Sequence, residues 1–287
     1  MMKKRLWSRW ILALAVVWPC MAAAHDRVRE KENFDFDWKF ILNADDRANA
    51  GMQVSEAGWQ DVQLPHDWSI SQNFDPKLSG SNGHLPGGIG WYRKTFRVDK
   101  KDKGRRIAVL FDGIYSRSDV YVNGQHLGFR PYGFCYQEYD LTPYLNYGAE
   151  NVLAVRVNNP LEHDSVARWY TGAGIYRHTW LVKTAEVHVA SYGTYVTTPV
   201  VTAERAEVRV RTSVANEAKR TKTLSVRQQI TDGEGRTVVQ SGKQTLQVAA
   251  GQTADTEHTL EIPRPQLWDT EHPYLYTLHT AVYDGRK

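Results

Sequence analysis

The chain has 287 residues, of which 41% are hydrophobic and 24% are charged, an ordinary globular composition with enough length for two domains. Residues 1–24 hold four of the 36 basic residues and none of the 32 acidic residues, so the remainder carries 32 of each and is formally neutral. That balance gives no electrostatic reason to expect nucleic acid or an anionic membrane as a partner.

The start of the chain has the pattern of a secretory signal peptide. Basic residues at positions 3–9 precede an apolar run at 11–17, which is too short for a membrane span. Three alanines at 22–24 then offer a cleavage site before His25. Cys20 would be the anchor of a lipoprotein, but bulky residues precede it where a lipidation motif has small ones. We therefore predict that residues 1–24 are removed and that the protein is secreted or periplasmic.

Strand patterns dominate the segment that follows, and helical periodicity is scarce. Residues 91–98 alternate charged groups, expected to face outward, with apolar groups, and residues 106–113 are apolar at their centre, as a buried strand is. Asn123-Gly124 separates two short β-type runs, which is a strong hairpin signal. Residues 151–159 continue the pattern. These features predict an all-β chain whose first domain, residues 25–189, is a β-sandwich.

The pattern changes near residue 190, where the strands become leaner and richer in threonine and valine. Regular spacing and short turns predict an immunoglobulin-like sandwich over residues 190–287. A long strand is expected at 274–283, followed by Asp284-Gly285, a turn signal. Because a turn calls for another strand after it, we expect this second sandwich to be incomplete at its C-terminal end.

Six motifs occur in an order that resembles the N-terminal part of glycoside hydrolase family 2, most closely its bacterial β-galactosidases. The likeness extends from about Asp35 to the last residue, and the ordered set is far more specific than any single motif. The motifs are VQLPHDWSI at 62–70, LPGGIGWYRKTF at 85–96, DVYVNGQHLG at 119–128, YDLTPYL at 139–145, RWYTGAGIYRHTWL at 168–181 and LWDTEHPYLYTL at 267–278.

The resemblance implies a jelly-roll (galactose-binding-like) sugar-binding domain and then an immunoglobulin-like domain. In the family a catalytic (β/α)₈ barrel follows, in which two glutamates about 5–5.5 Å apart carry out a retaining hydrolysis. No strand–helix alternation occurs in this sequence, so the barrel is absent from it and no catalytic residue is assigned. Asn216-Glu217 matches the family's catalytic Asn-Glu pair in type only, because it ends a strand and opens a turn. We expect the chain alone to be inactive.

The resemblance also implies that the loop before residue 175 approaches the sugar subsite at the mouth of the barrel. Arg168 could donate a forked pair of hydrogen bonds, and Trp169 and Tyr170 have flat faces that can cover a pyranose ring. Better-known family members carry an acidic residue at the position of Arg168. This chain has none there, so Asp164 is the candidate to replace that acidic residue. The alternative is that both aromatic residues pack the jelly roll against a neighbouring domain. Gly172 and Gly174 are expected to permit a tight backbone path.

A second loop, residues 84–90, is rich in glycine and is expected to approach the same subsite. Gly87 stands where several relatives have a sugar-binding Asn, so His84 is a candidate replacement, with an ordinary surface histidine as the alternative. His66 and Asp67 could suggest a catalytic pair, but no Ser or Cys nucleophile is placed beside them, and the adjacent Trp68 favours a structural turn.

No cofactor and no metal site are expected, because the histidines lack zinc spacing and Cys135 is the only cysteine after the signal peptide. The Cys135 thiol is expected to be buried. The expected partners are a β-galactoside-like carbohydrate and the enzyme's own barrel domain, with the oligomeric state open. Two alternatives stay open: a stand-alone carbohydrate-binding module, and a family 2 enzyme with β-glucuronidase or β-mannosidase specificity.

Overall fold

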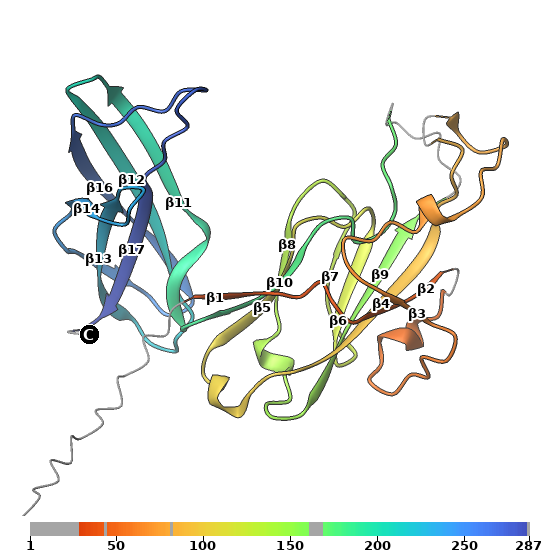
Figure 1. The fold of residues 1–287 in the computed structure, drawn as a ribbon. Coiled ribbons are helices and arrows are strands. Elements are labelled where there is room, and N and C mark those ends of the chain that lie inside the picture. Colours follow the sequence, from red (N-terminus) through yellow and green to blue (C-terminus); the bar gives the residue numbers. More distant parts are fainter. Residues whose placement is uncertain (1–28, 43–44, 81–82, 161–168, 286–287) are drawn as a thin grey trace, which may run out of the picture.

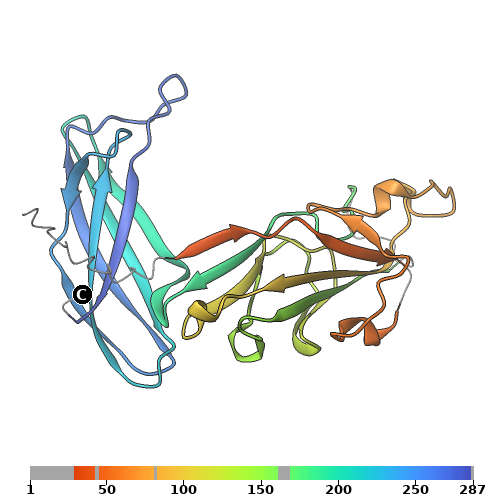
Figure 2. The same ribbon diagram turned by 60° about the horizontal axis from the view of Figure 1, so that its bottom comes forward.

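The computed structural model describes residues 29–42, 45–80, 83–160 and 169–285, which form two β-sandwiches lying end to end (Figures 1 and 2). The all-β prediction is confirmed. The signal-peptide prediction, Asp164 and Arg168 lie outside the described residues. No helix in the described ranges is long and apolar enough to span a membrane.

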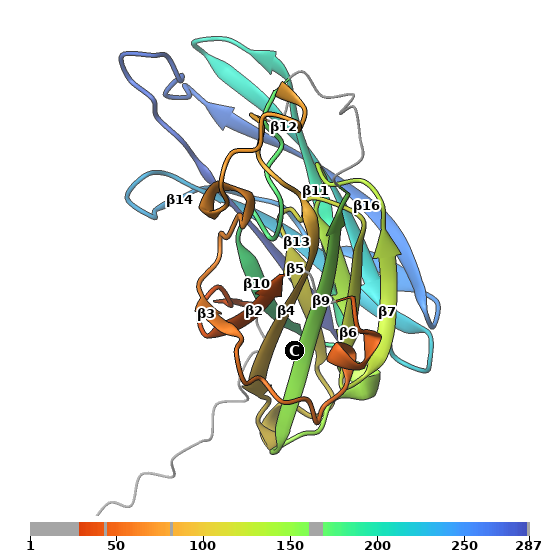
Figure 3. The same cartoon turned by 90° about the vertical axis from the view of Figure 1, so that its right-hand side faces the viewer.

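The first sandwich contains a six-stranded sheet in the order β3-β2-β4-β9-β6-β7 (Figure 3) and a four-stranded sheet in the order β1-β10-β5-β8. All pairings are antiparallel. The elements are β1 Glu30–Asn33, β2 Trp38–Leu42, η1 Arg47–Ala50, β3 Gln60–Val62, η2 Ser69–Ser71, β4 Gly88–Arg97, η4 Lys100–Asp102, β5 Arg106–Phe111, β6 Ser118–Val122, β7 Gln125–Arg130, β8 Gln137–Asp140, η5 Thr142–Tyr144, β9 Glu150–Asn159 and β10 Thr179–Thr184.

The core of this sandwich lies between its two sheets and is unusually aromatic. Trp38, Trp68 and Tyr92 are fully buried there, and the Phe40 and Trp68 rings stack with centroids 5.5 Å apart. Burial of such rings is the main stabilising contribution that this composition offers. The structural role expected for Trp68 is confirmed.

The β6–β7 hairpin has the turn that its sequence predicts. Asn123 and Gly124 have φ of 51° and 84°, so both central residues are left-handed, as a two-residue hairpin turn of this type requires. The Asn123 side chain also accepts a hydrogen bond from the backbone N–H of Val152 at 2.8 Å, and this contact joins the turn to β9.

The prediction that the charged residues of β4 face solvent is wrong for Arg93 and Lys94, which are only 1% and 8% exposed. The segment 45–59 covers the outer face of the six-stranded sheet, and Trp91 packs there beside Ala50 in a small second core. Arg93 donates to the carbonyl oxygens of Asn49 and Gly51, at 2.5 and 2.7 Å, and pairs with the Glu56 carboxylate at 3.0 Å. The guanidinium therefore holds the covering segment on the sheet.

The second sandwich has a three-stranded sheet, β11-β12-β16, facing a sheet built around β13. On one side β13 pairs with β14 and β15, and on the other it pairs with β17 over its full length. The strand expected at 274–283 is therefore present as β17. The strands are β11 Val187–Val201, β12 Arg205–Asn216, β13 Lys222–Thr231, β14 Thr237–Gln240, β15 Gln244–Val248, β16 Gln252–Pro263 and β17 Thr277–Asp284.

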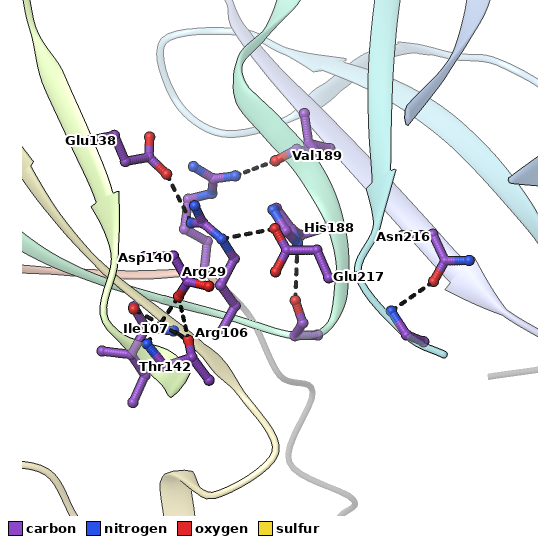
Figure 4. A network of polar contacts seen from close by, with 12 residues as sticks. Arg29, Arg106, Ile107, Glu138, Asp140, Thr142, His188, Val189, Asn216 and Glu217 are labelled. Atoms are coloured by element: carbon purple, nitrogen blue, oxygen red, sulfur yellow. Dashed lines mark hydrogen bonds and ion pairs between the residues drawn. The ribbon is translucent and has the colours of Figure 1, made fainter. Parts of the chain in front are cut away.

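An ionic network joins the two sandwiches (Figure 4). Arg106 of β5 contacts Glu138 of β8 at 2.8 Å and Glu217, which follows β12, at 2.9 Å. Arg29 reaches from the first sandwich to donate to the carbonyl oxygen of Val189 in β11. Burial raises the pKa of the Glu217 carboxyl even though Arg106 lies beside it. The junction is thus a desolvated set of charges, in which removing one partner leaves another uncompensated.

His188 in the same junction predicts a pH-dependent stability. Burial, with Arg106 and Arg29 nearby, lowers its pKa to about 4, although the hydrogen bond from Nδ1 to the carbonyl oxygen of Ala185 and the nearby Glu138 carboxylate both act to raise it. An unfolded histidine gains a proton near pH 6.5, so stability is full above that pH and falls as the pH drops toward 4.

We expect the loss to be on the order of 2 kcal/mol. Urea unfolding of the native protein and of His188→Gln at several pH values measures it, and the variant should have the flatter profile. Because every other titrating group is common to both proteins, parallel profiles would contradict the assignment to His188.

Candidate functional site

Three loops meet along the upper side of the first sandwich in Figure 1: residues 64–72, residues 83–90 and residues 169–175. Backbone hydrogen bonds join the first to the third, from His66 N–H to the Ile175 carbonyl at 2.8 Å and from Trp68 N–H to the Ala173 carbonyl at 3.1 Å. The Ser69 hydroxyl donates to the Pro86 carbonyl at 2.7 Å and so joins the second loop. The loops therefore form one connected surface.

The Asp67 carboxylate is the centre of this arrangement. It accepts hydrogen bonds from Tyr170 Oη at 2.5 Å, from the Ala173 N–H at 2.9 Å and from the Ser69 N–H at 3.0 Å. Burial raises the pKa of Tyr170, so the phenol remains a donor. Asp67 thus fixes the path of residues 170–173, and sequence reasoning, which considered it only as a turn residue or half of a catalytic pair, did not foresee this contact.

The prediction that Gly172 and Gly174 permit a tight backbone path is confirmed. Their φ angles are 73° and 128°. A Cβ on Gly172 would lie 2.7 Å from Asp67 Oδ2, and one on Gly174 would lie 2.4 Å from the Tyr92 hydroxyl and 2.6 Å from the His66 carbonyl oxygen. Only glycine fits at either position without displacing its neighbours.

Trp169 and Tyr170 stand at the open side of this surface. The Trp169 residue is 62% exposed and Tyr170 is 39% exposed, so within the described residues neither is packed into a core. Asn159 donates from its amide to the Gly172 carbonyl at 3.1 Å and supports the loop from β9. The arrangement presents one exposed indole on an anchored loop, which is suited to stacking on the apolar face of a sugar.

His84 lies in the neighbouring loop but is engaged with its own segment. Its Nδ1 donates to the Leu78 carbonyl at 2.8 Å, and its backbone has a left-handed φ of 57°. The adjacent Gly83 approaches the Tyr170 ring, since a Cβ there would lie 4.0 Å from Tyr170 Cδ2. Gly87 lies against β9, where a Cβ would be 2.2 Å from the Asn159 carbonyl oxygen. A sugar contact by His84 stays a prediction.

His66 has a structural environment. Its Nδ1 lies 2.8 Å from the Tyr92 hydroxyl, and burial lowers its pKa. Since Asp67 is used by the loop 170–173, the two residues do not form a relay toward a nucleophile. The contacts of His66 and Asp67 therefore support the structural turn that the sequence predicts for this motif.

Asn216 and Glu217 also have structural roles. The buried Asn216 amide donates to the carbonyl oxygens of Arg220, Val248 and Ala249, which closes the turn after β12. The Glu217 carboxylate pairs with Arg106 across the domain junction (Figure 4). Sequence reasoning placed the pair correctly at a strand end but did not foresee the inter-domain contact.

Two smaller expectations concern cysteine and metals. Cys135 is partly exposed in the loop before β8, and its thiol lies 3.7 Å from the Tyr132 carbonyl oxygen, so the expectation of a buried thiol is wrong. Within the described ranges no group of three or more metal-binding side chains comes together.

Comparison with known families matches both halves of the chain. Residues 32–185 match the model described as "Glycosyl hydrolases family 2, sugar binding domain", and residues 187–287 match the model described as "Glycosyl hydrolases family 2". Each match coincides with one of the two sandwiches.

Individual relatives agree with this result. "Beta-galactosidase BoGH2A" from Bacteroides ovatus is 42% identical over 271 residues, which cover 92% of this chain and 31% of that protein. A "Beta-glucuronidase" from Formosa agariphila is 33% identical and is covered to 28%.

Solved structures give the same fold. A family 2 member from Bacteroides cellulosilyticus superposes with a TM-score of 0.80 at 39% identity, covering 90% of this chain and 35% of that one. A β-glucuronidase of the family superposes with a TM-score of 0.82 at 32% identity. This chain therefore spans about a third of the length of the relatives it matches. Because a family model matches each of its two sandwiches, the chain belongs to glycosyl hydrolase family 2.

Proposed function

We propose that this chain supplies the sugar-binding and immunoglobulin-like domains of a β-galactosidase-like hydrolase, and that its anchored loop 169–175 borders the sugar subsite of a catalytic domain. The observation that carries this proposal is Trp169, which is 62% exposed on a loop held by Asp67 and two glycines. An exposed indole on a fixed backbone loses little conformational entropy when it stacks on a sugar. The 42% identity to a protein named as a β-galactosidase supports the substrate class.

Catalysis is assigned to a domain beyond these residues. A retaining glycosidase needs two carboxyl groups about 5–5.5 Å apart, and the strand-end candidate Glu217 is instead bound to Arg106. The present chain would shape the pocket and contribute binding energy. Its partners are therefore a β-galactoside and the catalytic domain.

A β-glucuronidase is the second candidate, favoured by the 33% identical relative from Formosa agariphila and by the superposition with a TM-score of 0.82. The two activities differ in a carboxylate on the sugar. A cation such as Arg168 on this loop would suit a glucuronide, because guanidinium groups bind carboxylates through paired hydrogen bonds. Substrate preference is thus the measurement that separates the two candidates.

A chimera tests the proposal, with this chain replacing the matching third of the Bacteroides ovatus relative. Trp169→Ala should lower kcat/KM for the preferred nitrophenyl β-glycoside by about 10- to 100-fold, as the loss of one stacked aromatic does, with little change in melting temperature. The chain alone should hydrolyse neither the galactoside nor the glucuronide.

Trp268→Ala is the matched control, since Trp268 is 58% exposed but lies in the second sandwich. It should leave kcat/KM unchanged. If Trp169→Ala keeps full activity and lowers the melting temperature instead, the residue packs between domains and the proposed role is wrong.

We also propose export, from the signal-like pattern of residues 1–24. N-terminal sequencing of protein recovered from the periplasm or the medium should begin at His25. Recovery of a chain that begins at Met1 would contradict this proposal.

A further inference from the structure

A group of exposed aromatic side chains lies outside the loop site, where the two sandwiches meet. We call it the aromatic surface, and it consists of Tyr132, Phe134 and Tyr136 from the loop before β8 and Tyr192 from β11. Their exposed fractions are 60, 45, 46 and 67%. The Tyr136 and Tyr192 rings have centroids 4.4 Å apart, so the surface is continuous across both domains.

The loop that carries these rings is fixed from beneath. A Cβ on Gly133 would lie 2.4 Å from the Tyr115 ring, and the Tyr176 hydroxyl donates to the Gly133 carbonyl at 3.0 Å. Phe134 contacts Tyr115 and Tyr176 through ring centroids 5.1 and 6.4 Å away. The aromatic surface is therefore a preformed feature of the fold. Exposed apolar surface of this kind marks an interaction site rather than ordinary scattered residues.

The geometry of the rings favours a protein partner over a sugar. The Tyr132 and Phe134 planes meet at 72°, and Phe134 meets Tyr115 at 48°, so the rings present edges and hollows instead of one flat platform. Phe134 has no polar group to orient a hydroxyl. Such interlocking aromatics are typical of the centre of a protein interface.

The same segment connects this surface to the candidate sugar site. Tyr115 and Gly174 exchange backbone hydrogen bonds of 2.8 Å in both directions, and the residue before Gly174, Ala173, donates to Asp67. A body that covered the aromatic surface would touch both sandwiches and would lie beside the loop that carries Trp169. The relatives are about three times as long as the part that this chain matches, so about two thirds of each relative is available to form a domain that covers this surface.

We propose that the aromatic surface is the docking site for the catalytic domain that occupies the remaining two thirds of these relatives. This inference rests on the proposed function. It adds the place of contact, and it gives that contact a role: covering Tyr136 and Tyr192 together fixes the angle between the two sandwiches while the catalytic domain is held against the loop 169–175.

Hydroxyl-radical labelling tests the proposal on this chain alone and on the chimera with the Bacteroides ovatus relative. Labelling of Tyr132 and Tyr192 should be high in the chain alone and should fall in the chimera to the level of Tyr92, which is fully buried in this chain. Tyr144, 43% exposed in η5 at the other end of β8, is the matched control and should be labelled equally in both proteins.

Equal labelling of Tyr132 and Tyr192 in the two proteins would overturn the proposal. So would protection in the chain alone that grows with its concentration, which would make a second copy the partner, or protection by added galacto-oligosaccharide, which would make the surface a sugar platform. If the chimera is insoluble, the same labelling is done on the chain mixed with the remaining part of the relative, and unchanged labelling there also overturns it. The readout is independent of hydrolysis, so a chimera inactive on both glycosides but protected would reject the proposed specificity and keep the docking site.

Discussion

Gly174→Ala is expected to destabilise the first sandwich by about 3–5 kcal/mol, because two separate costs coincide at this position. The φ of 128° is unfavourable for any residue with a Cβ. The added Cβ would also meet the Tyr92 hydroxyl at 2.4 Å and the His66 carbonyl oxygen at 2.6 Å. The second of these is backbone and cannot rotate away, so the loop 169–175 or the turn at His66 must move.

Urea unfolding followed by tryptophan fluorescence measures the effect, since Trp38, Trp68 and Trp91 are buried in this sandwich. Gly58→Ala is the matched control: its φ is 83°, but a Cβ there meets nothing within 4 Å. It should cost only about 1 kcal/mol, the price of the backbone conformation. Equal effects of the two substitutions would show that steric contact at Gly174 is unimportant.

The same substitution has a functional consequence, because the loop that displays Trp169 is held through its neighbours at 172–174. Asp67 accepts from Ala173 N–H on one side of Gly174, and Tyr115 pairs with Gly174 itself. A displaced backbone would lose both contacts. Preorganised loops bind with less entropic cost than loops that must be ordered by the ligand, so stability and sugar binding should decline together in this variant.

Features set by local sequence were predictable. The turn at Asn123-Gly124 and the left-handed glycines at 172 and 174 follow from the conformations that these residues favour within a few positions. Strand positions such as β9 and β17 follow from alternation and from apolar runs. In each case the cause lies within the segment itself, and no knowledge of distant neighbours is needed.

Features made by distant residues were not predictable. Asp67 and Tyr170 are 103 positions apart, and nothing in either motif indicates that one bonds the other. Glu217 was predicted only as a turn residue, because Arg106, its partner, lies in the other sandwich. Alternation in β4 separates two faces of a strand, but it does not say whether a third segment covers the outer face, which is why Arg93 was misassigned.

Arg93→Ala is expected to cost about 3–5 kcal/mol, the typical effect of removing one partner from a buried charged cluster. The guanidinium is 1% exposed and joins β4 to the Asn49 and Gly51 carbonyl oxygens and to the Glu56 carboxylate. Alanine would leave these acceptors without their donor and would open a cavity beneath the segment 45–59. Arg93→Lys should recover part of the loss, since one ammonium cannot reproduce the planar fork.

The control is Arg97→Ala on the same strand. Arg97 has a side chain that is 68% exposed and pairs with Glu150 at 3.4 Å, so its loss should change stability by no more than about 1 kcal/mol. Hydrogen exchange adds a local readout: in Arg93→Ala the amides of residues 45–59 should exchange faster, while those of β5 and β10 in the opposite sheet remain protected. If those outer-segment amides keep their native protection and the stability loss matches that of Arg97→Ala, Arg93 does not hold the covering segment, and Trp91 with its apolar neighbours must be sufficient to do so.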